Sequence, residues 1–221
     1  MGDFIKKVRA FLENLPRFLE NKPHFWGNKP SFLRPLPYPL SSIQYSHFFT
    51  MSYNKKAVLA ANTAAIGLLL RLEKEQRTAT EEEQKVLRAY QGFGGLKCIL
   101  NRTDQPEDIR YWSKSEQDLF APTCALKQLI YREAPSADMA KRYWESIKAS
   151  VLTSFYTDTR IVNAIADSLE KIGVTFRTCL DPSLGMGAFA ETLAPHVGRV
   201  DAFEKDLLTA RIAQSLHPLG Q

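Results

Sequence analysis

The chain has 221 residues, of which 44% are hydrophobic and 24% are charged, and this balance excludes collagen-like and intrinsically disordered proteins. The length allows one hydrophobic core, or a small helical domain followed by part of a second domain. The formal net charge of +5 favours a polyanionic partner only weakly, because general surface charge explains it equally well.

The cysteines and the apolar runs indicate a cytoplasmic protein. Cys98, Cys124 and Cys179 are odd in number and too widely spaced for paired metal-ligand patterns, so we expect reduced thiols and no metal site. The longest apolar run, at 57–70, is interrupted by polar residues and is shorter than the roughly 20 residues that span a bilayer. We therefore expect no membrane contact, and the polar N-terminus argues against a secretory signal.

The first 50 residues differ in composition from the rest. Apolar residues recur at near-helical spacing from Phe4 to Leu19, which predicts a short amphipathic helix. The segment 21–39 combines prolines with aromatic residues, which favours an extended backbone. Met51 then begins a run typical of a translation start. We interpret residues 1–50 as a Pro- and aromatic-rich extension that is non-native or disordered, with a genuine flexible arm as the alternative.

Residues 51–150 predict a helical subdomain, and its first half carries the clearest signals. A composition rich in Ala, Leu, Lys and Glu predicts a helix over 55–76. Thr78 or Thr80 can cap a second helix that runs to about residue 90. Thr80 and Glu83 have the spacing of a capping box, in which each side chain satisfies a backbone amide at the helix start.

The second half of this subdomain predicts two more helices. One is expected over 115–131, with Ser113 or Ser115 as its cap, and another over 137–150. Before them lies the glycine cluster Gly92–Gly95. It is interpreted as a helix C-cap and turn, with a nucleic-acid or interdomain contact as the alternative.

After Thr157 the pattern changes to short strands that alternate with helices. A helix is expected over 158–171 and a turn at Gly173, followed by two strands that each lead into a helix. Such alternation is typical of βαβ units with a parallel sheet. The predicted fold class is therefore α/β: a helical subdomain, followed in residues 151–221 by the start of a parallel sheet.

A glycine loop follows the first of these strands. The strand ends in Asp181, and a tight loop with Gly185 and Gly187 leads into the next helix. In an open α/β sheet ligands bind outside the carboxyl ends of the strands, where glycines allow close approach of the backbone. The Lys-Ser/Thr of a P-loop is absent, and the third glycine of a dinucleotide fingerprint would fall at Ala190. An acid in this loop would repel a pyrophosphate but can pair with a cationic amino-acid group.

The second strand, over 199–204, ends in another acid, Glu204. An acid at this place can accept hydrogen bonds from both hydroxyl groups of a ribose. The local alternatives are a solvated strand end for Glu204 and a helix cap for Asp181. Two acids at neighbouring strand ends around a glycine loop rarely arise by chance, so we favour a nucleoside-type ligand.

The segment Asp181–Phe189 resembles the first S-adenosylmethionine motif of amino-group DNA methyltransferases, and Glu204 matches the acid of their second motif. In that family the first motif surrounds the methionine part of the cofactor and the second motif's acid holds the ribose. The resemblance therefore implies a Rossmann-like methyltransferase sheet that binds S-adenosylmethionine. The cofactor-binding residues that it implies in these motifs are Asp181, Pro182, Ser183, Gly185, Gly187, Phe189 and Glu204.

Upstream, the segment 154–158 resembles the one that precedes the first motif in type I and related adenine methyltransferases. In those enzymes a Tyr-Thr pair contacts the amino-acid end of the cofactor. The resemblance implies the same role for Tyr156 and Thr157, and adenine as the target base. Read locally, Thr157 or Asp158 is a helix cap and Tyr156 is a packed aromatic residue.

More widely, residues 51–76, 90–97 and 202–209 resemble the opening of large methylase-helicase proteins from conjugative elements of gut Bacteroidales. This implies DNA as the partner, with further methylase and helicase regions downstream. The chain departs from the pattern at Leu184, where the family usually has a small residue. It also lacks, after Glu204, the Asn/Asp/Ser-Pro-Pro-Tyr/Phe motif that holds the target amine and stacks on the flipped base.

From these departures we expect the chain alone to bind the cofactor weakly and to be inactive. A sheet of two strands also leaves an unpaired edge and an uncovered helix face. The alternative function is a non-catalytic DNA-binding or partner-docking module. It depends on the basic residues of the helical part, Lys55, Lys56, Arg71, Lys74, Lys97, Arg102, Arg110 and Lys114.

Overall fold

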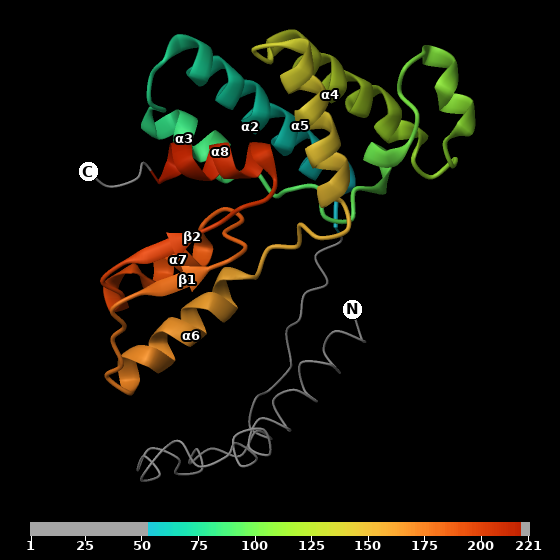
Figure 1. Cartoon of the computed structure of the whole chain (residues 1–221). Coiled ribbons are helices and arrows are strands. Elements are labelled where there is room, and N and C mark those ends of the chain that lie inside the picture. Colours follow the sequence, from blue (N-terminus) through green and yellow to red (C-terminus); the bar gives the residue numbers. More distant parts are fainter. Residues whose placement is uncertain (1–52, 218–221) are drawn as a thin grey trace, which may run out of the picture. The chain divides into compact units, whose positions relative to one another are not determined.

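The computed structural model describes residues 53–217 (Figure 1), and the structural statements below concern these residues. The chain divides into two units, Met1–Met51 and Ser52–Gln221. The helix expected between Phe4 and Leu19 and the extended segment 21–39 lie outside the described residues.

The first helices along the described chain form one packed group. They are α2 (Lys55–Glu75), α3 (Glu81–Arg88), α4 (Phe120–Glu133) and α5 (Ala137–Ser150). Helix α2 packs against α3 and α4, and α4 packs against α5. Their shared core includes the fully buried side chains Leu59, Ile66, Leu69, Leu87, Leu126, Ile130, Tyr143 and Ile147. Within residues 53–217 no helix has the length and apolar character needed to cross a membrane.

Helices α2 and α3 both begin after residues whose side chains cap the first turn. Helix α2 begins after Asn54, whose side chain accepts a hydrogen bond from the Ala57 amide, and it covers nearly all of the predicted range. The predicted capping box of α3 is confirmed: the Thr80 side chain accepts from the Glu83 amide, and the Glu83 carboxylate accepts from the Thr80 amide. These bonds satisfy amide groups that have no partner inside the helix.

The predicted start of the third helix is wrong. Helix α4 begins at Phe120, and the preceding residues form short 3-10 turns, η2 (Lys97–Leu100), η3 (Pro106–Tyr111) and η4 (Gln117–Leu119). Neither predicted cap serves the helix, since the hydroxyl groups of Ser113 and Ser115 bond to each other at 3.2 Å. Pro122 gives the physical reason. A proline is tolerated in the first turn of a helix, but deeper inside it would clash with the carbonyl four residues earlier.

The rest of the chain is a parallel βαβ arrangement. It consists of α6 (Thr159–Lys171), β1 (Cys179–Asp181), α7 (Ala188–Leu193), a 3-10 turn η5 (Ala194–His196), β2 (Val200–Ala202) and α8 (Leu207–Leu216). The strands pair in parallel, with Cys179 opposite Val200 and Asp181 opposite Ala202. The α/β class is thus confirmed as a mostly helical chain with a small parallel sheet. Strand β1 ends at Asp181 as predicted, whereas β2 is shorter than the predicted 199–204 and ends two residues before Glu204.

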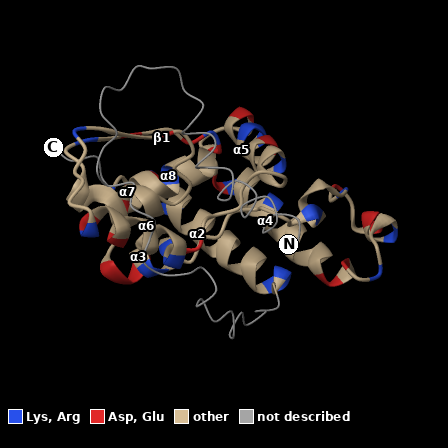
Figure 2. Cartoon of the chain, turned by 90° about the horizontal axis from the view of Figure 1, so that it is seen from below, with Lys and Arg blue, Asp and Glu red and all other residues tan. Residues whose placement is uncertain are grey.

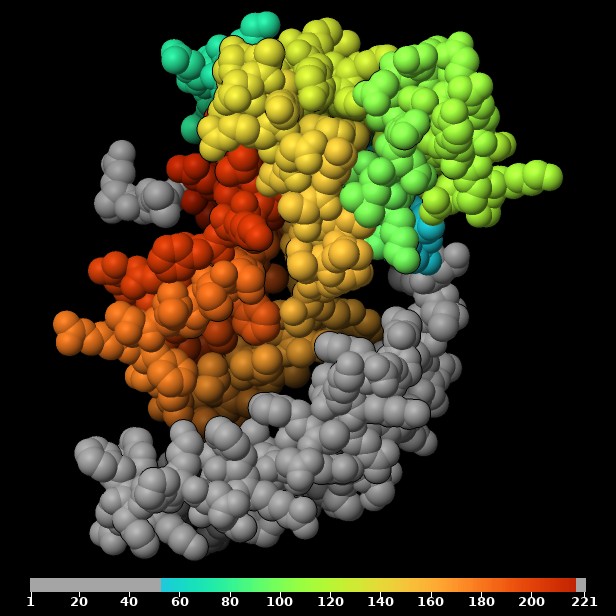
Figure 3. Space-filling view, turned by 45° about the vertical axis from the view of Figure 1, so that its right-hand side comes forward, coloured from blue at the N-terminus to red at the C-terminus, as the bar shows by residue number. Residues whose placement is uncertain are grey.

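Helix α8 joins the core of the first helices although it follows β2 in the sequence. Its residues Leu208, Ile212 and Leu216 are buried in the same apolar cluster as α2 and α5. Figure 3 shows α8 directly beside α5, in agreement with the contacts of α8 to α2, α3 and α5. The βαβ arrangement and the first helices are therefore joined by a shared hydrophobic core.

Polar contacts support this docking. The Arg211 guanidinium on α8 lies 2.7 Å from the Glu73 carboxylate on α2. Burial raises the pKa of Glu73, and the charge of Arg211 opposes that rise. The Asp206 carboxylate caps α8 by accepting from the Thr209 amide at 2.7 Å, and it also accepts from the Ser146 hydroxyl on α5 at 2.9 Å. The start of α8 is thus fixed to α5 as well as to its own first turn.

One face of the sheet and one face of α6 expose apolar side chains, as expected for a two-stranded sheet. Side chains alternate along a strand, so the register places Leu180 and Phe203 on the same face. These two side chains are 63% and 64% exposed. On α6, Ile161 and Ile165 are four residues apart, share one helix face and are also exposed.

Truncation of a buried side chain of α8 tests whether this helix packs in the core. Ile212→Ala should lower the free energy of unfolding of the full chain by about 2–4 kcal/mol, because it leaves a cavity in a closely packed core. Gln214→Ala, on the exposed side of the same helix, is the matched control and should change it by less than about 0.5 kcal/mol. Urea denaturation followed by circular dichroism measures both. Equal midpoints for the two variants would contradict the docking of α8.

Candidate functional site

The loop between β1 and α7 is held by backbone hydrogen bonds to the chain that leaves β2. Gly185 and Gly187 have φ values of 55° and 87°, in the left-handed region that favours glycine. The Leu184 amide donates to the Phe203 carbonyl at 2.8 Å, and the Phe203 amide donates to the Asp181 carbonyl at 2.9 Å. The loop is therefore attached to the chain that leaves β2, which brings the carboxyl ends of both strands together.

Asp181 lies at the start of this loop with one carboxylate oxygen engaged and one without a partner. Its Oδ1 accepts from the Ser183 amide at 3.0 Å. Its Oδ2 is buried and has no hydrogen-bond partner among the described residues. The N-cap of α7 is Gly187, so the interpretation of Asp181 as a cap of that helix is wrong. A buried carboxylate oxygen without a partner is costly, and a cationic ligand would compensate that cost.

Glu204 connects the two strand ends. Its Oε2 accepts from the Gly185 amide at 2.8 Å, and its Oε1 accepts from the Asp206 amide, also at 2.8 Å. The side chain is half-buried, so the interpretation of Glu204 as a simply solvated strand end is wrong. The acid predicted to bind a ribose thus also fixes the glycine loop.

Tyr156 packs directly on that glycine loop. A Cβ atom built on Gly185 would lie 3.1 Å from both Cδ1 and Cε1 of the Tyr156 ring. The hydroxyl group points inward and lies 3.3 Å from the Thr209 hydroxyl, and its burial raises the pKa of Tyr156. Tyr156 is thus a packed aromatic residue, and its ring belongs to the wall of the loop.

The two residues after Tyr156 do not contact the glycine loop through any hydrogen bond among the described residues. Thr157 is exposed, and Asp158 is the N-cap of α6, accepting from the Arg160 amide at 2.9 Å. The Arg160 guanidinium and this amide lower the pKa of Asp158 to about 2. Of the two caps that the sequence allowed for this helix, Asp158 is the one that forms.

The remaining predicted residues line the loop with different exposure. Pro182 and Ser183 are exposed, and Phe189 is half-buried in the first turn of α7. Gly187 is buried, and a Cβ atom there would lie 2.9 Å from Nε2 of His217, which in turn lies 3.2 Å from the Met186 carbonyl. The glycine at 187 therefore allows the end of α8 to close one side of the loop.

Sequence reasoning missed Asp206 and Thr209. The position of Asp206, directly before an apolar helix, is a cap signal that could have identified it. Thr209 has no local signal, since its contacts arise only from the docking of α8 beside Tyr90 and Tyr156.

The Gly92–Gly95 loop contacts the segment that leads to Tyr156. The C-cap of α3 is Ala89, in a right-handed conformation, so the interpretation of these glycines as a helix C-cap is wrong. The turn predicted with it is confirmed at Gly94 and Gly95. A Cβ atom on Gly94 would lie 1.9 Å from the Ser154 carbonyl oxygen, a distance that excludes any side chain there. The Gly95 amide donates to the Val151 carbonyl at 2.9 Å. The glycines thus allow a contact between the helical part and the segment 151–156, within one compact unit of the chain. A nucleic-acid contact of this loop stays a prediction.

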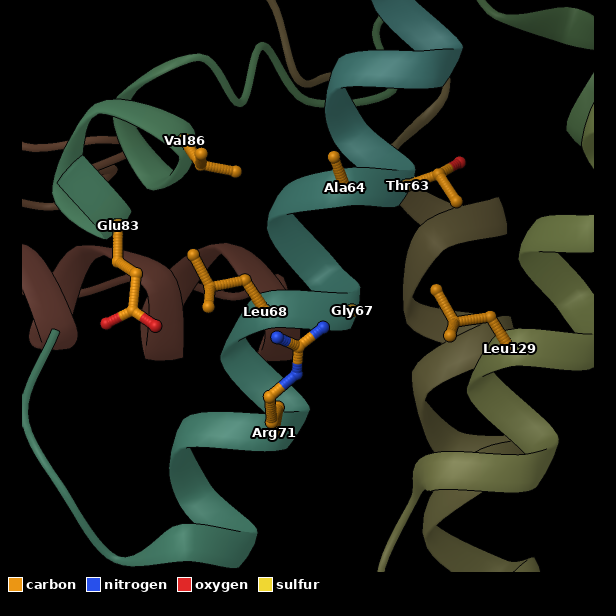
Figure 4. A pocket seen from close by; sticks show the side chains of 8 residues that line it. All are labelled: Thr63, Ala64, Gly67, Leu68, Arg71, Glu83, Val86 and Leu129. Atoms are coloured by element: carbon orange, nitrogen blue, oxygen red, sulfur yellow. The ribbon is translucent and has the colours of Figure 1, made fainter.

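A groove on the helical part lies apart from these residues. It has a volume of about 450 Å³ and opens between α2, α3 and α4. Figure 4 shows Leu129 of α4 on one side, with Leu68, Val86 and Glu83 on the other. None of the residues that line it is a predicted cofactor residue; the lining is Thr63, Ala64, Gly67, Leu68, Arg71, Glu83, Val86 and Leu129.

The charges of the described chain are nearly balanced. Of the 29 Lys and Arg and the 24 Asp and Glu in the sequence, seven and three fall in residues 1–52, which leaves 22 and 21 for the remainder. Figure 2 shows both signs interspersed along the helices. Among the basic residues of the alternative module, Lys55 pairs with Glu116 at 2.7 Å. This distribution does not favour a strongly basic DNA-binding face.

Comparisons with protein-family models, with curated proteins and with solved structures gave no match to the chain.

Loss of the Glu204 carboxylate should destabilise the loop. In Glu204→Ala the buried Gly185 amide loses its acceptor, which should lower the free energy of unfolding by about 1–3 kcal/mol. The control is Glu170→Ala, an exposed residue of α6, which should change the free energy of unfolding by less than about 0.5 kcal/mol. Urea denaturation of the full chain measures both. An effect of Glu204→Ala no larger than that of the control would show that Glu204 does not hold the loop.

Proposed function

We propose that this chain carries the cofactor-binding residues of an S-adenosylmethionine-dependent methyltransferase that acts on adenine in DNA. The observation that carries the proposal is the buried, unpartnered Oδ2 of Asp181 at the carboxyl end of β1, beside a glycine loop. A Rossmann-like methyltransferase sheet belongs to the same proposal, and the parallel pairing of β1 and β2 around α7 supports it.

The charges of the loop favour this cofactor over a nucleotide. S-adenosylmethionine has a cationic ammonium group and a cationic sulfur, whereas a nucleotide presents phosphates. Asp181 and Glu204 place two carboxylates around the loop, and they would repel a phosphate. The free oxygen of Asp181 can accept a charge-assisted hydrogen bond from the ammonium group, which compensates its burial.

Glu204 would bind a ribose while its carboxylate also accepts hydrogen bonds from the Gly185 and Asp206 amides. Each of its carboxylate oxygens accepts one backbone amide, and each has a second lone pair available for a ribose hydroxyl. Because this carboxylate is already partly satisfied, its gain on binding a ribose is small. Weak cofactor binding is the expected result, and Pro182 and Ser183 leave the outer side of the loop open to solvent.

The role proposed for the described residues is to bind and orient the cofactor. When bound, S-adenosylmethionine supplies a methyl group on a cationic sulfur. The sequence contains no two consecutive prolines, so residues that hold the target base are not proposed within this chain. Adenine in DNA as the substrate, and a place in a methylase-helicase protein, rest on the sequence resemblance, whereas a cytoplasmic location rests on the odd number of cysteines.

Titration of S-adenosylhomocysteine into the ¹⁵N-labelled full chain tests the proposal. We expect saturable shifts of the Gly185 and Gly187 amide signals with a dissociation constant on the order of 0.1–1 mM, or about −4 to −5.5 kcal/mol. Asp181→Asn should weaken binding roughly tenfold or more, because it removes the charge that faces the ammonium group.

Two controls make this test specific. Asp201→Asn removes an acid of β2 that pairs with Arg199 on the surface at 2.6 Å, and it should bind like the parent. Adenosine diphosphate should leave the glycine signals unchanged, because the two carboxylates repel it. A parent chain that shows no shift at several-millimolar S-adenosylhomocysteine, or equal binding by Asp181→Asn, would contradict the proposed function.

A further inference from the structure

Three hydroxyl groups from distant parts of the chain meet beside the glycine loop. The Thr209 hydroxyl on α8 lies 3.1 Å from the hydroxyl of Tyr90 and 3.3 Å from that of Tyr156. Thr209 and Tyr90 are buried, at 1% and 3% exposure. A hydroxyl group donates one hydrogen bond and accepts up to two, so Thr209 can bond both tyrosines at once. Thr209 is thus the centre of this group.

The Tyr156 ring fits into a space that two separate glycines leave free. On one side a Cβ atom at Gly92 would lie 2.8 Å from the Tyr156 hydroxyl oxygen. On the other side a Cβ atom at Gly185 would lie 3.1 Å from the ring. Gly94 allows the backbone of the helical part to reach Ser154, two residues before Tyr156. Side chains at these glycines would displace the ring or the segment that carries it.

We propose that Thr209 is a positioning residue: it holds the Tyr156 ring against Gly185 and so keeps the cofactor loop in its binding shape. What the loop binds rests on the function proposed above. The Tyr156 ring and the Glu204 carboxylate thus contact the same residue, Gly185. The helical part of the chain is then a component of the cofactor site, through Tyr90, Gly92 and the docked helix α8.

The two tyrosines differ in burial, so we expect loss of the Thr209 hydroxyl to move the Tyr156 ring more than the Tyr90 ring. Tyr90 is buried, and its ring packs edge-on against Phe93 with centroids 6.2 Å apart. Tyr156 is 37% exposed, although its hydroxyl bonds to the buried Thr209. A buried hydroxyl without a partner costs about 1–3 kcal/mol. If the Thr209 hydroxyl is removed, Tyr156 can swing toward solvent to avoid that cost, whereas Tyr90 is enclosed.

The position of the ring can be measured at Gly185, because an aromatic ring in contact with a glycine shifts its NMR signals. In the ¹⁵N-glycine-labelled full chain, Thr209→Val should move the Gly185 signal, and Thr209→Ser, which keeps the hydroxyl, should leave it near the parent position. The affinity for S-adenosylhomocysteine should fall roughly three- to tenfold in Thr209→Val and recover in Thr209→Ser.

Thr63→Val is the matched control. It also removes a threonine hydroxyl from a helix, one that bonds its own helix at the Leu59 carbonyl at 2.7 Å, and it should change neither quantity. If Thr209→Val fails to fold, Tyr156→Phe removes the same hydrogen bond while leaving the one between Tyr90 and Thr209, and it should move the same signal.

Each result decides one part of the inference. An unmoved Gly185 signal in Thr209→Val, or in Tyr156→Phe where the first variant does not fold, overturns the positioning role. A moved signal with unchanged affinity overturns the connection between the ring and cofactor binding. A parent chain that does not bind S-adenosylhomocysteine refutes the proposed function, and the Gly185 signal still decides whether Thr209 positions Tyr156.

Discussion

The burial of helix α8 in the core of the first helices is the interaction on which the rest of the described structure depends. The apolar residues Leu208, Ile212 and Leu216 are removed from water together with side chains of α2 and α5. Because α8 follows β2 by only a few residues, this burial fixes where the carboxyl end of β2 lies. Burying three such side chains, at about 1.5–3 kcal/mol each, contributes about 4.5–9 kcal/mol, which exceeds what two three-residue strands can provide alone.

The geometry of the loop follows from this anchor. The chain from β2 to α8 carries Glu204 and Asp206, and the Glu204 carboxylate reaches across to the Gly185 amide. The first turn of α8 carries Thr209, which meets Tyr156 from the segment before α6. Two contacts therefore hold Gly185, one from the segment before α6 and one from the chain that follows β2. The exposed apolar faces of the sheet and of α6 make no such contribution.

The sequence predicted well those features that depend on neighbouring residues. The capping box of α3, the helix over 137–150 and the strand-loop-helix at Asp181 were predicted correctly, because each is determined within a few residues. The start of α4 was predicted wrongly, since Ser113 and Ser115 resemble helix caps, whereas Pro122 is accommodated only in the first turn of the helix.

Contacts between distant segments could not be predicted in this way. Gly94 is required because the Ser154 carbonyl, sixty residues later in the sequence, lies close to its backbone. From the sequence alone, the same cluster of glycines resembles a helix cap. Thr209 looks like an ordinary helix residue until α8 is docked beside Tyr156. The position of Asp181 was predictable from its place at a strand end, whereas its unpartnered oxygen depends on the packing around it.

Hydrogen-deuterium exchange of the full chain with and without S-adenosylhomocysteine tests the central claim most directly. The account predicts slower amide exchange in peptides that cover 181–189 and 203–209, because the cofactor would bind to this loop and strengthen its hold on Glu204. Peptides that cover the groove residues 63–71 should be unchanged. Unchanged exchange at the loop under saturating ligand, or protection confined to the groove, would contradict the placement of a cofactor site at Asp181 and Glu204.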